Sequence, residues 1–374
     1  MGELSRKQQK LMEEARAFAR GLSVNPTGVE GKAEKARRLY DSFAKNGYHA
    51  LLISRRFGGR GLDHLSAGLI YEALSYEVPG TLHGPLTSVH CASMIESACQ
   101  NPYHEQRLRD IARKQAPAGF CLTEEAAGSD ITSITAAASK TKDGYALAGT
   151  KSIVINHAIA RIFIVFTSWP AETGRTALNA FAVDAGLPGI TLSEPYNTLG
   201  FSSGVMGSVS FDNVQVPQEC LLGEMGSGYL LFMETLDKGR PLVASCCAGE
   251  ASKALDLTVS HAKDRMQFKK PLSEFQAVNF TLADLATRLH AARLVTRNAL
   301  MLIDEGKPFT MEASMAKLLA SEVLFDIASF GLEILGHRTI TAQNEICRIY
   351  HDARLMKAID GTANVQRMVI ASQL

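Results

Sequence analysis

The sequence of 374 residues contains no run of about 18 apolar residues, so no segment is typical of a membrane-spanning helix. The N-terminal residues carry charges at helical spacing where an export signal would need an apolar run. The seven cysteines form no C-x-x-C pair or other close-spaced ligand set, and their odd number favours reduced thiols. These absences predict a cytoplasmic protein that is neither exported nor membrane-spanning.

Excess charge of either sign is also lacking, because 39 Lys and Arg face 38 Asp and Glu and leave a net charge of +1. No global field therefore favours nucleic acid or an anionic membrane surface, and neither is an expected partner. The glycine run Gly58–Gly61 lacks the G-x-G-x-x-G spacing of a dinucleotide fold and the Lys-Ser/Thr of a phosphate loop. The histidines show no metal-ligand spacing, so no metal is assigned.

What is present is a change of hydrophobic period along the chain. Helical spacing runs through the first third and returns after Gly226, with long helices predicted near 227–264, 274–305 and 310–336. Between them, short β-branched and aromatic runs separated by turn residues predict strands. We expect a mostly α, α+β fold with an N-terminal helical domain (1–116), a middle antiparallel β-sheet domain (117–225) and a C-terminal helical bundle (226–374).

Four segments carry residues suited to chemistry. The segment 119–130 begins as a strand and ends in a Gly-Ser loop, whose N–H groups and hydroxyl suit a planar heterocycle or a phosphate. A sheet edge with a capped turn is the simpler alternative for it. The other segments are 236–240 (LDKGR), 264–268 (DRMQF) with 275–276 (FQ), and 359–367 (IDGTANVQR).

Taken together, in this order and at these distances, these segments resemble the acyl-CoA dehydrogenase family over nearly the whole chain. The most specific matches are L-T-E…G-S-D, the strand from Gly149-x-Lys151 to Asn156, R-x-x-F with F-Q, and D-G-T…Q-R. The resemblance implies the helix, sheet, helix architecture and an FAD between the sheet and the C-terminal bundle. It also implies that a carboxylate removes the proton α to a thioester carbonyl while a hydride leaves the β carbon for the flavin.

The resemblance also assigns cofactor contacts. On the sheet side they are Leu122, Thr123, Gly128, Ser129 and Ile155. Three further residues resemble those that contact the FAD of a neighbouring subunit, which implies a homodimer or homotetramer: Arg265, Phe268 and Gln276. A solvated helix charge is the alternative for Arg265. The remaining assignments are Glu333 and Gly336 in the family's Q-x-x-G-G turn, and Thr362 and Asn364 near the adenosine and ribityl groups.

The same resemblance places the acyl site at Ser129, Asp237, Arg240 and Gly361. Arg240 has a second interpretation, as a buried helix arginine paired with a carboxylate. Asp360 stands immediately before Gly-Thr, at the place of the family's usual catalytic glutamate, and is the expected base. Its side chain is about 1.5 Å shorter, and proton transfer is sensitive to an error of that size. A structural alternative makes Asp360 the N-cap of the helix after Gly361.

Several residues depart from the family's pattern. Ile153 and Ile155 stand where an aromatic ring covers the flavin and where a threonine hydroxyl bonds its N5 atom. Glu333 replaces a glutamine and His337 a glycine. The departures favour relatives in polyketide and nonribosomal peptide pathways, which oxidise short acyl, α-hydroxyacyl or α-aminoacyl units held on an acyl carrier protein.

Other functions stay open at this point: a short-chain acyl-CoA dehydrogenase, a flavin oxidase or monooxygenase of a small carbon acid with Asp360 as base, and a flavin-binding scaffold without activity. An electron-transfer flavoprotein is the expected acceptor for a dehydrogenase. A carrier protein presents an acidic helix, so its docking surface should be basic. The candidate clusters are Arg55, Arg56 and Arg60, or Lys263, Lys269 and Lys270, and a solvated face is the alternative for each.

Overall fold

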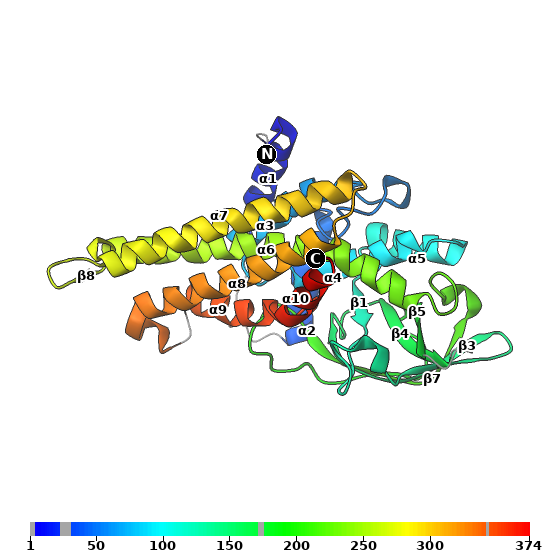
Figure 1. Cartoon of the computed structure of the whole chain (residues 1–374). Helices are drawn as coiled ribbons and strands as arrows, with labels where there is room; N and C mark the ends of the chain where they lie inside the picture. Colours follow the sequence, from blue (N-terminus) through cyan, green and yellow to red (C-terminus); the bar gives the residue numbers. More distant parts are fainter. Residues whose placement is uncertain (1–3, 23–30, 171–175, 342–343) are drawn as a thin grey trace.

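The computed structural model describes residues 4–22, 31–170, 176–341 and 344–374, and it has the predicted order of helices, sheet and helices (Figure 1). The chain begins with α1 (Arg6–Arg20), α2 (Lys32–Lys45), the short 3-10 turn η1 (Arg55–Phe57), α3 (His64–Glu77), α4 (His83–Ser97) and α5 (Pro102–Lys114). After the sheet come α6 (Gly228–Asp264), α7 (Gln276–Asp304), α8 (Thr310–Leu335), α9 (Glu345–Met356) and α10 (Ala363–Ala371).

Local sequence signals set several helix ends. The Asp63 side chain accepts a hydrogen bond from Ser66 N and caps α3, and Asn101 caps α5 ahead of a proline in its first turn. The three long predicted helices are confirmed, and their bounds agree closely with the prediction. Each helix ends where the sequence changes to a glycine, a proline or a charged turn. One irregularity is Pro241, which lies buried inside α6.

In the described part of the chain, the sheet has seven strands: β1 (Ala118–Cys121), β2 (Ala137–Lys140), β3 (Gly144–Ile155), β4 (Ile162–Pro170), β5 (Thr176–Asp184), β6 (Ile190–Leu192) and β7 (Met206–Pro217). Their order is β1-β4-β2-β3-β7-β6, with β5 also paired to β4. The predicted antiparallel arrangement holds for four pairings, but β1 and β2 each pair parallel to β4. The sheet is therefore mixed, because β1 enters directly from the helical part and lies beside a strand that is not its sequence neighbour.

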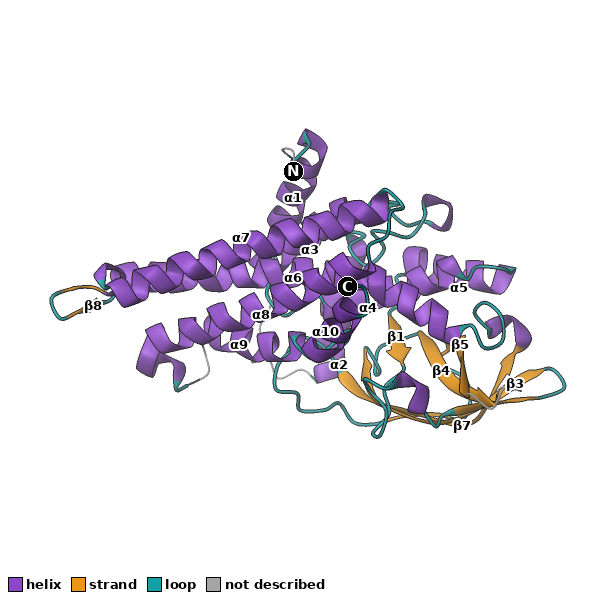
Figure 2. Ribbon diagram, in the orientation of Figure 1, coloured by secondary structure: helices purple, strands orange, loops and turns teal. Residues whose placement is uncertain are grey.

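Small residues let the long helices approach closely. Ala244, Cys246, Cys247 and Ala248 on α6 are each at most 1% exposed, and a Cβ added at Gly249 would lie 2.3 Å from a main-chain oxygen of α3. Helices α6, α7 and α8 run side by side as a long bundle (Figure 2). Helix α3 packs on α6 and α7, so the first and last parts of the chain share one core.

The bundle has two different ends. A two-stranded hairpin, β8 (Met266–Gln267) with β9 (Lys270–Pro271), joins α6 to α7 at the end remote from the sheet (Figure 1). Phe268 at its tip is 88% exposed. None of the helices in the described part of the chain is long and apolar enough to cross a membrane.

Candidate active site

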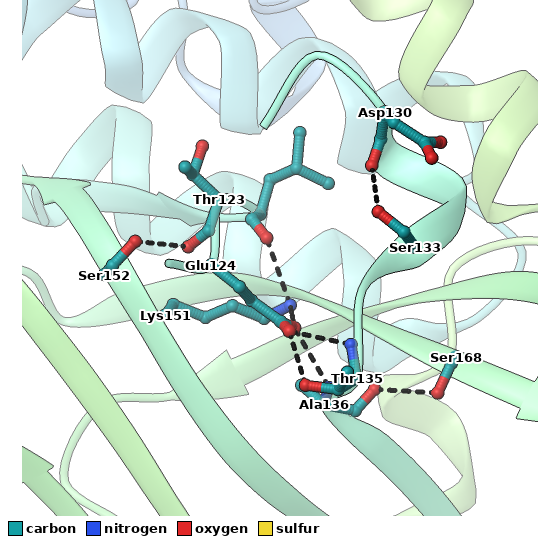
Figure 3. Close-up of polar contacts among 10 residues, drawn as sticks. Thr123, Glu124, Asp130, Ser133, Thr135, Ala136, Lys151, Ser152 and Ser168 are labelled. Carbon is teal, nitrogen blue, oxygen red and sulfur yellow. Dashed lines mark hydrogen bonds and ion pairs between the residues drawn. The ribbon is translucent and has the colours of Figure 1, made fainter. Parts of the chain in front are cut away.

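A buried ion pair fixes the loop that follows β1. Lys151 Nζ donates to Glu124 Oε1 at 2.7 Å and to the Leu122 carbonyl at 3.1 Å (Figure 3). The Glu124 carboxylate also accepts hydrogen bonds from the main chain and hydroxyl of Thr135 and from Ala136 N. Although burial would raise the pKa of Glu124, these donors hold it below its usual value. The two ends of the 125–134 loop are therefore tied to the sheet.

A β-bulge makes this pair possible. The register of β3 against β7 shifts between Lys151 and Val154, and both of these side chains are fully buried. Ile153, between them, is turned outward and is 49% exposed. The bulge thus sends the lysine inward to Glu124 and presents an apolar side chain on the opposite side.

The outer side of β3 carries apolar side chains near the end of the strand. Ile153 is exposed and Ile155 half-buried, and Ser152 N bonds the Thr123 carbonyl at 2.8 Å, which brings the 123–129 loop beside them. A Cβ added at Gly128 would meet only Thr123 Cγ2, at 4.0 Å. Such a surface, apolar with a glycine in the loop at its rim, fits a planar ring system. The sequence-predicted residues Thr123, Gly128 and Ser129 lie in this loop and Ile155 lies on β3, whereas the side chain of Leu122 is buried in a hydrophobic core cluster.

Asp360 lies in a turn between α9 and α10. Its φ is 51° and that of Gly361 is 86°, so two consecutive residues are left-handed. The N-cap of α10 is Thr362, whose side chain accepts from Val365 N, and the interpretation of Asp360 as that cap is therefore wrong. Asp360 is half-buried. Its carboxylate lies close enough to raise the pKa of His90, of Arg240 and of Lys317, partly offsetting the lowering by burial.

Arg240 and Asp237 form a buried pair one turn apart on α6. Arg240 Nη1 donates to Asp237 Oδ1 at 2.5 Å and to Ser314 Oγ at 3.2 Å, while Thr310 donates to Asp237 Oδ2 at 2.7 Å. Arg240 is 1% exposed, as its second interpretation expects. Its Nε is buried without a partner in the described part of the protein, so one guanidinium donor remains for a ligand.

His90 of α4 lies against the same turn of α6. A Cβ at Gly239 would lie 2.7 Å from His90 Nε2, and this ring nitrogen has no partner among the described residues. Burial lowers the pKa of His90, which favours the neutral ring. The surroundings of Asp360 are thus polar and charged.

The remaining predicted residues lie elsewhere. Arg265, Phe268 and Gln276 are on or beside the hairpin, at the opposite end of the bundle from the sheet (Figure 1). Glu333 and Gly336 are exposed at the end of α8. Asn364 is exposed on α10. One protomer therefore does not bring the hairpin residues and the sheet-side residues to the same ligand.

Sequence reasoning missed four residues that shape the site. Glu124 and Gln366 lie inside the motifs quoted above but received no role from the sequence. For Glu124, Lys151 of the predicted strand could have suggested a partner. His90 and Lys317 lie in helices where nothing in the local pattern sets them apart. Only the packing of α4 and α8 against α6 brings them to Asp360.

Comparisons with known proteins agree with this geometry. Models of the acyl-CoA dehydrogenase N-terminal, middle and C-terminal domains match residues 5–115, 119–214 and 226–374. The chain is 33% identical over 349 residues to the caffeyl-CoA reductase-Etf complex subunit CarC of Acetobacterium woodii, covering 92% of each protein. It is 33% identical over 379 residues to the bovine mitochondrial short-chain specific acyl-CoA dehydrogenase, covering 100% of this chain and 91% of that relative.

Two solved structures show the same fold over the full length. Butyryl-CoA dehydrogenase from Megasphaera elsdenii aligns with a TM-score of 0.92 and 31% identity, covering 100% of this chain and 99% of that one. The prolyl acyl carrier protein oxidase AnaB aligns with a TM-score of 0.91 and 25% identity over 99% of both chains. A structure titled as an FAD-dependent dehydrogenase also aligns, with a TM-score of 0.92 and 27% identity over 100% of this chain and 99% of that one, and the apolar face of β3 fits the isoalloxazine ring of FAD. The chain belongs to the acyl-CoA dehydrogenase family of FAD-dependent oxidoreductases.

Proposed function

We propose that this protein dehydrogenates a short acyl thioester delivered by an acyl carrier protein, with Asp360 as the base. The observation that carries the proposal is the half-buried Asp360 carboxylate, set before a left-handed glycine and surrounded by Arg240, His90 and Lys317. Arg240 and Lys317 place positive charge beside the group that abstracts the proton.

The chain supplies position and charge for this reaction. Asp360 removes the proton α to the thioester carbonyl, and the negative charge that develops on the carbonyl oxygen needs donors fixed in advance. The N–H groups of Asp360 and Gly361 make no hydrogen bond within the described residues, so both are available as such donors. FAD, bound against β3, supplies the acceptor for the hydride that leaves the β carbon.

The polarity around Asp360 supports a short acyl group. Arg240, Asp237 and His90 are each at least nine-tenths buried, and two of them keep an unpartnered polar nitrogen. A long alkyl chain packed against them would leave these groups desolvated without a partner. A small acyl unit, or one bearing a hydroxyl or amino group, could satisfy them instead.

A basic surface supports delivery by a carrier protein. Arg55, Arg56, Arg60 and Arg113 gather around η1, where Arg113 packs on Gly58 and Arg56 lies over the Phe57 ring. Nothing acidic pairs with these four guanidinium groups in the parts of the chain that the structure describes, and we call them the arginine patch. The alternative cluster, Lys263, Lys269 and Lys270, lies at the hairpin end instead.

The arginine patch is connected to the acyl site through two contacts. His64, which follows the η1 loop, bonds Asp304 at the end of α7, at 2.7 Å through its main-chain N–H. The 305–309 loop then leads to Thr310, which bonds Asp237. Docking of an acidic helix on the patch would place the carrier on the side of η1 and the α7–α8 loop, from which we propose that its acyl arm enters.

The assembly and the electron acceptor belong to the same proposal. We propose a homodimer or homotetramer in which Arg265, Phe268 and Gln276 complete the FAD site of a neighbouring subunit, since they lie far from β3 of their own. The relative CarC is named as a subunit of a reductase-Etf complex, which supports an electron-transfer flavoprotein as acceptor. All seven cysteines are free, which supports a place in the cytoplasm.

The test is an anaerobic titration of the FAD-loaded protein with matched acyl groups linked to a carrier protein or to CoA, followed by flavin absorbance. We expect faster bleaching by carrier-linked groups, a rate lowered by the pair Arg56→Glu and Arg113→Glu, and no reduction by Asp360→Asn. Faster reaction with the CoA thioester would favour the acyl-CoA dehydrogenase alternative. Oxygen consumption without an added acceptor would favour an oxidase, which is how AnaB is named. Reduction of Asp360→Asn at the parental rate would refute the assignment of the base.

A further inference from the structure

Two buried side chains hold the turn that carries Asp360. Lys317 Nζ, from α8, donates to the Gly361 carbonyl at 2.7 Å. Gln366 Nε2, from α10, donates to the carbonyls of both Asp360 and Gly361, at 3.1 and 3.0 Å. Lys317 and Gln366 are both 0% exposed. Three hydrogen bonds from two helices thus converge on two adjacent carbonyls.

We propose, on the basis of the function above, that Lys317 and Gln366 are positioning residues, which hold the Asp360–Gly361 turn so that the short aspartate side chain reaches the α proton. Neither residue touches the reacting atoms. Their action passes through the main chain of the turn.

The conformation of the turn shows why it needs anchors. Left-handed backbone costs a non-glycine residue about 1–2 kcal/mol, and Asp360 adopts it at φ 51°. At Gly361, with φ 86°, an added Cβ would also lie 2.7 Å from Gln366 Nε2. Such a conformation persists only where the surroundings determine it. Here the surroundings are the two donors and the main-chain bond from Ala363 N to Lys357 O, which closes the turn.

The anchors also set the direction of the free N–H groups. Because a peptide unit is planar and trans, its N–H points away from its C=O. Fixing the Asp360 carbonyl on Gln366 therefore directs the Gly361 N–H to the opposite side. Lys317 and Gln366 thus position both the Asp360 carboxylate and the Gly361 N–H donor.

An aspartate depends on its backbone more than a glutamate would. Aspartate has two side-chain torsions and glutamate three, so a glutamate can absorb a small displacement of its Cα by changing rotamer. With the shorter side chain, an error in the turn passes directly to the carboxylate. A misplacement of about 1 Å costs about 100-fold in rate.

The charge of Lys317 adds a dependence on pH. Burial lowers its pKa to about 8, while the nearby Cys247 and Asp360 raise it and Arg240 and Lys357 lower it further. His90 faces Asp360 from α4. Above about pH 8 the lysine loses its proton, so its hydrogen bond to Gly361 weakens and the cation beside Asp360 disappears.

The experiment compares Lys317→Met and Gln366→Met in the FAD-loaded protein, with Lys253→Met on α6 as a control. We measure flavin reduction by the thioester that reduces the parent, with and without deuterium at the α carbon. We expect the rate constant to fall about 10- to 100-fold in both variants, with little change in thioester affinity and a larger isotope effect. Lys253→Met should keep the parental rate.

Two further readouts separate positioning from general stability. Adding Asp360→Glu to Lys317→Met should recover part of the lost rate, because the extra torsion compensates for a loosened turn. Hydrogen exchange should quicken in peptides covering 357–366 and stay unchanged in β3. The parent's loss of rate above about pH 8 should be absent in Lys317→Met.

Parental rates of reduction in both variants, or equal rate loss with and without Asp360→Glu, would overturn the inference. If Lys317→Met does not fold, the Gln366→Met result alone decides. The proposed function fails separately, when Asp360→Asn in the parent background still reduces the flavin.

Discussion

Substituting Asp352 should change how the stability of the protein depends on pH. Asp352 of α9 and Glu250 of α6 are buried on either side of Gly80, where an added Cβ would lie 2.1 Å from Asp352 Oδ2. Phe201 N donates to Asp352 and Gly80 N donates to Glu250, while Glu250 Oε2 is buried without a partner among the described residues. Two carboxyl groups thus share one poorly solvated space.

The magnitude follows from the pKa values. Burial raises the pKa of Asp352 from 3.8 to about 7, and burial together with Asp352 raises that of Glu250. The folded protein therefore keeps a proton on Asp352 that the unfolded chain has already lost above about pH 4. Between about pH 4 and 7 the folded state binds more protons, so stability falls as pH rises. A shift of about three units corresponds to about 4 kcal/mol at pH 8.

Asp352→Asn removes this loss of stability with rising pH, because an amide stays neutral. Its oxygen can still accept from Phe201 N, and its Nδ2 group can donate to Glu250. We expect the variant to match the parent near pH 4 and to be more stable by up to about 4 kcal/mol at pH 8. The measurement is the difference in unfolding midpoint, by heat and by urea, from about pH 4 to about pH 8.5.

The control is Asp212→Asn, which replaces an exposed carboxyl on β7 and should give a curve parallel to the parent's at every pH. Glu250→Gln should reduce the pH dependence in the same sense as Asp352→Asn. If the difference in unfolding midpoint between Asp352→Asn and the parent stays constant across this pH range, Asp352 does not hold a proton in the folded protein and the reasoning is refuted.

Two further outcomes are expected. Lys151→Met leaves Glu124 buried with only the donors of Thr135 and Ala136, and should destabilise the protein by about 3 kcal/mol in urea unfolding. Adding Glu124→Gln should recover part of the lost stability, and additive losses of the two substitutions would contradict the pairing. Arg265→Ala should lower the flavin content after gel filtration without changing the fold by circular dichroism, and an unchanged ratio of flavin to protein would argue against a shared cofactor site.

The architecture could be predicted largely from the sequence because periodicity reports burial on one face. Helices α6, α7 and α8 are long stretches of helix-forming residues that end at charged or glycine-containing turns, so their existence and bounds could be predicted from the sequence. The pairing of β1 parallel to β4 could not be predicted this way. Strand partners depend on contacts between segments about 45 residues apart, and nothing local encodes which edge a strand joins.

The sequence alone identified only part of the candidate site, again because it shows local motifs and not the packing of distant segments. Asp360 and Arg265 stand in short motifs, so a resemblance could mark them. Lys317 looks like any other lysine of a helix, and its role depends on being fully buried where α8 meets α10. Burial of a charge is a property of packing, which a sequence shows poorly when the helix is apolar on several faces.

Pro241 interrupts α6 at the acyl site and has a consequence for how a ligand is held. Proline has no N–H group, so the helical bond that would end on the carbonyl of Asp237, four residues earlier, is not made. Helix α6 therefore presents one main-chain oxygen without its intrahelical donor, beside the Asp237–Arg240 pair. Under the proposed function, this oxygen would accept a hydrogen bond from an amide N–H of the thioester arm, and it belongs to the longest helix in the described part of the protein.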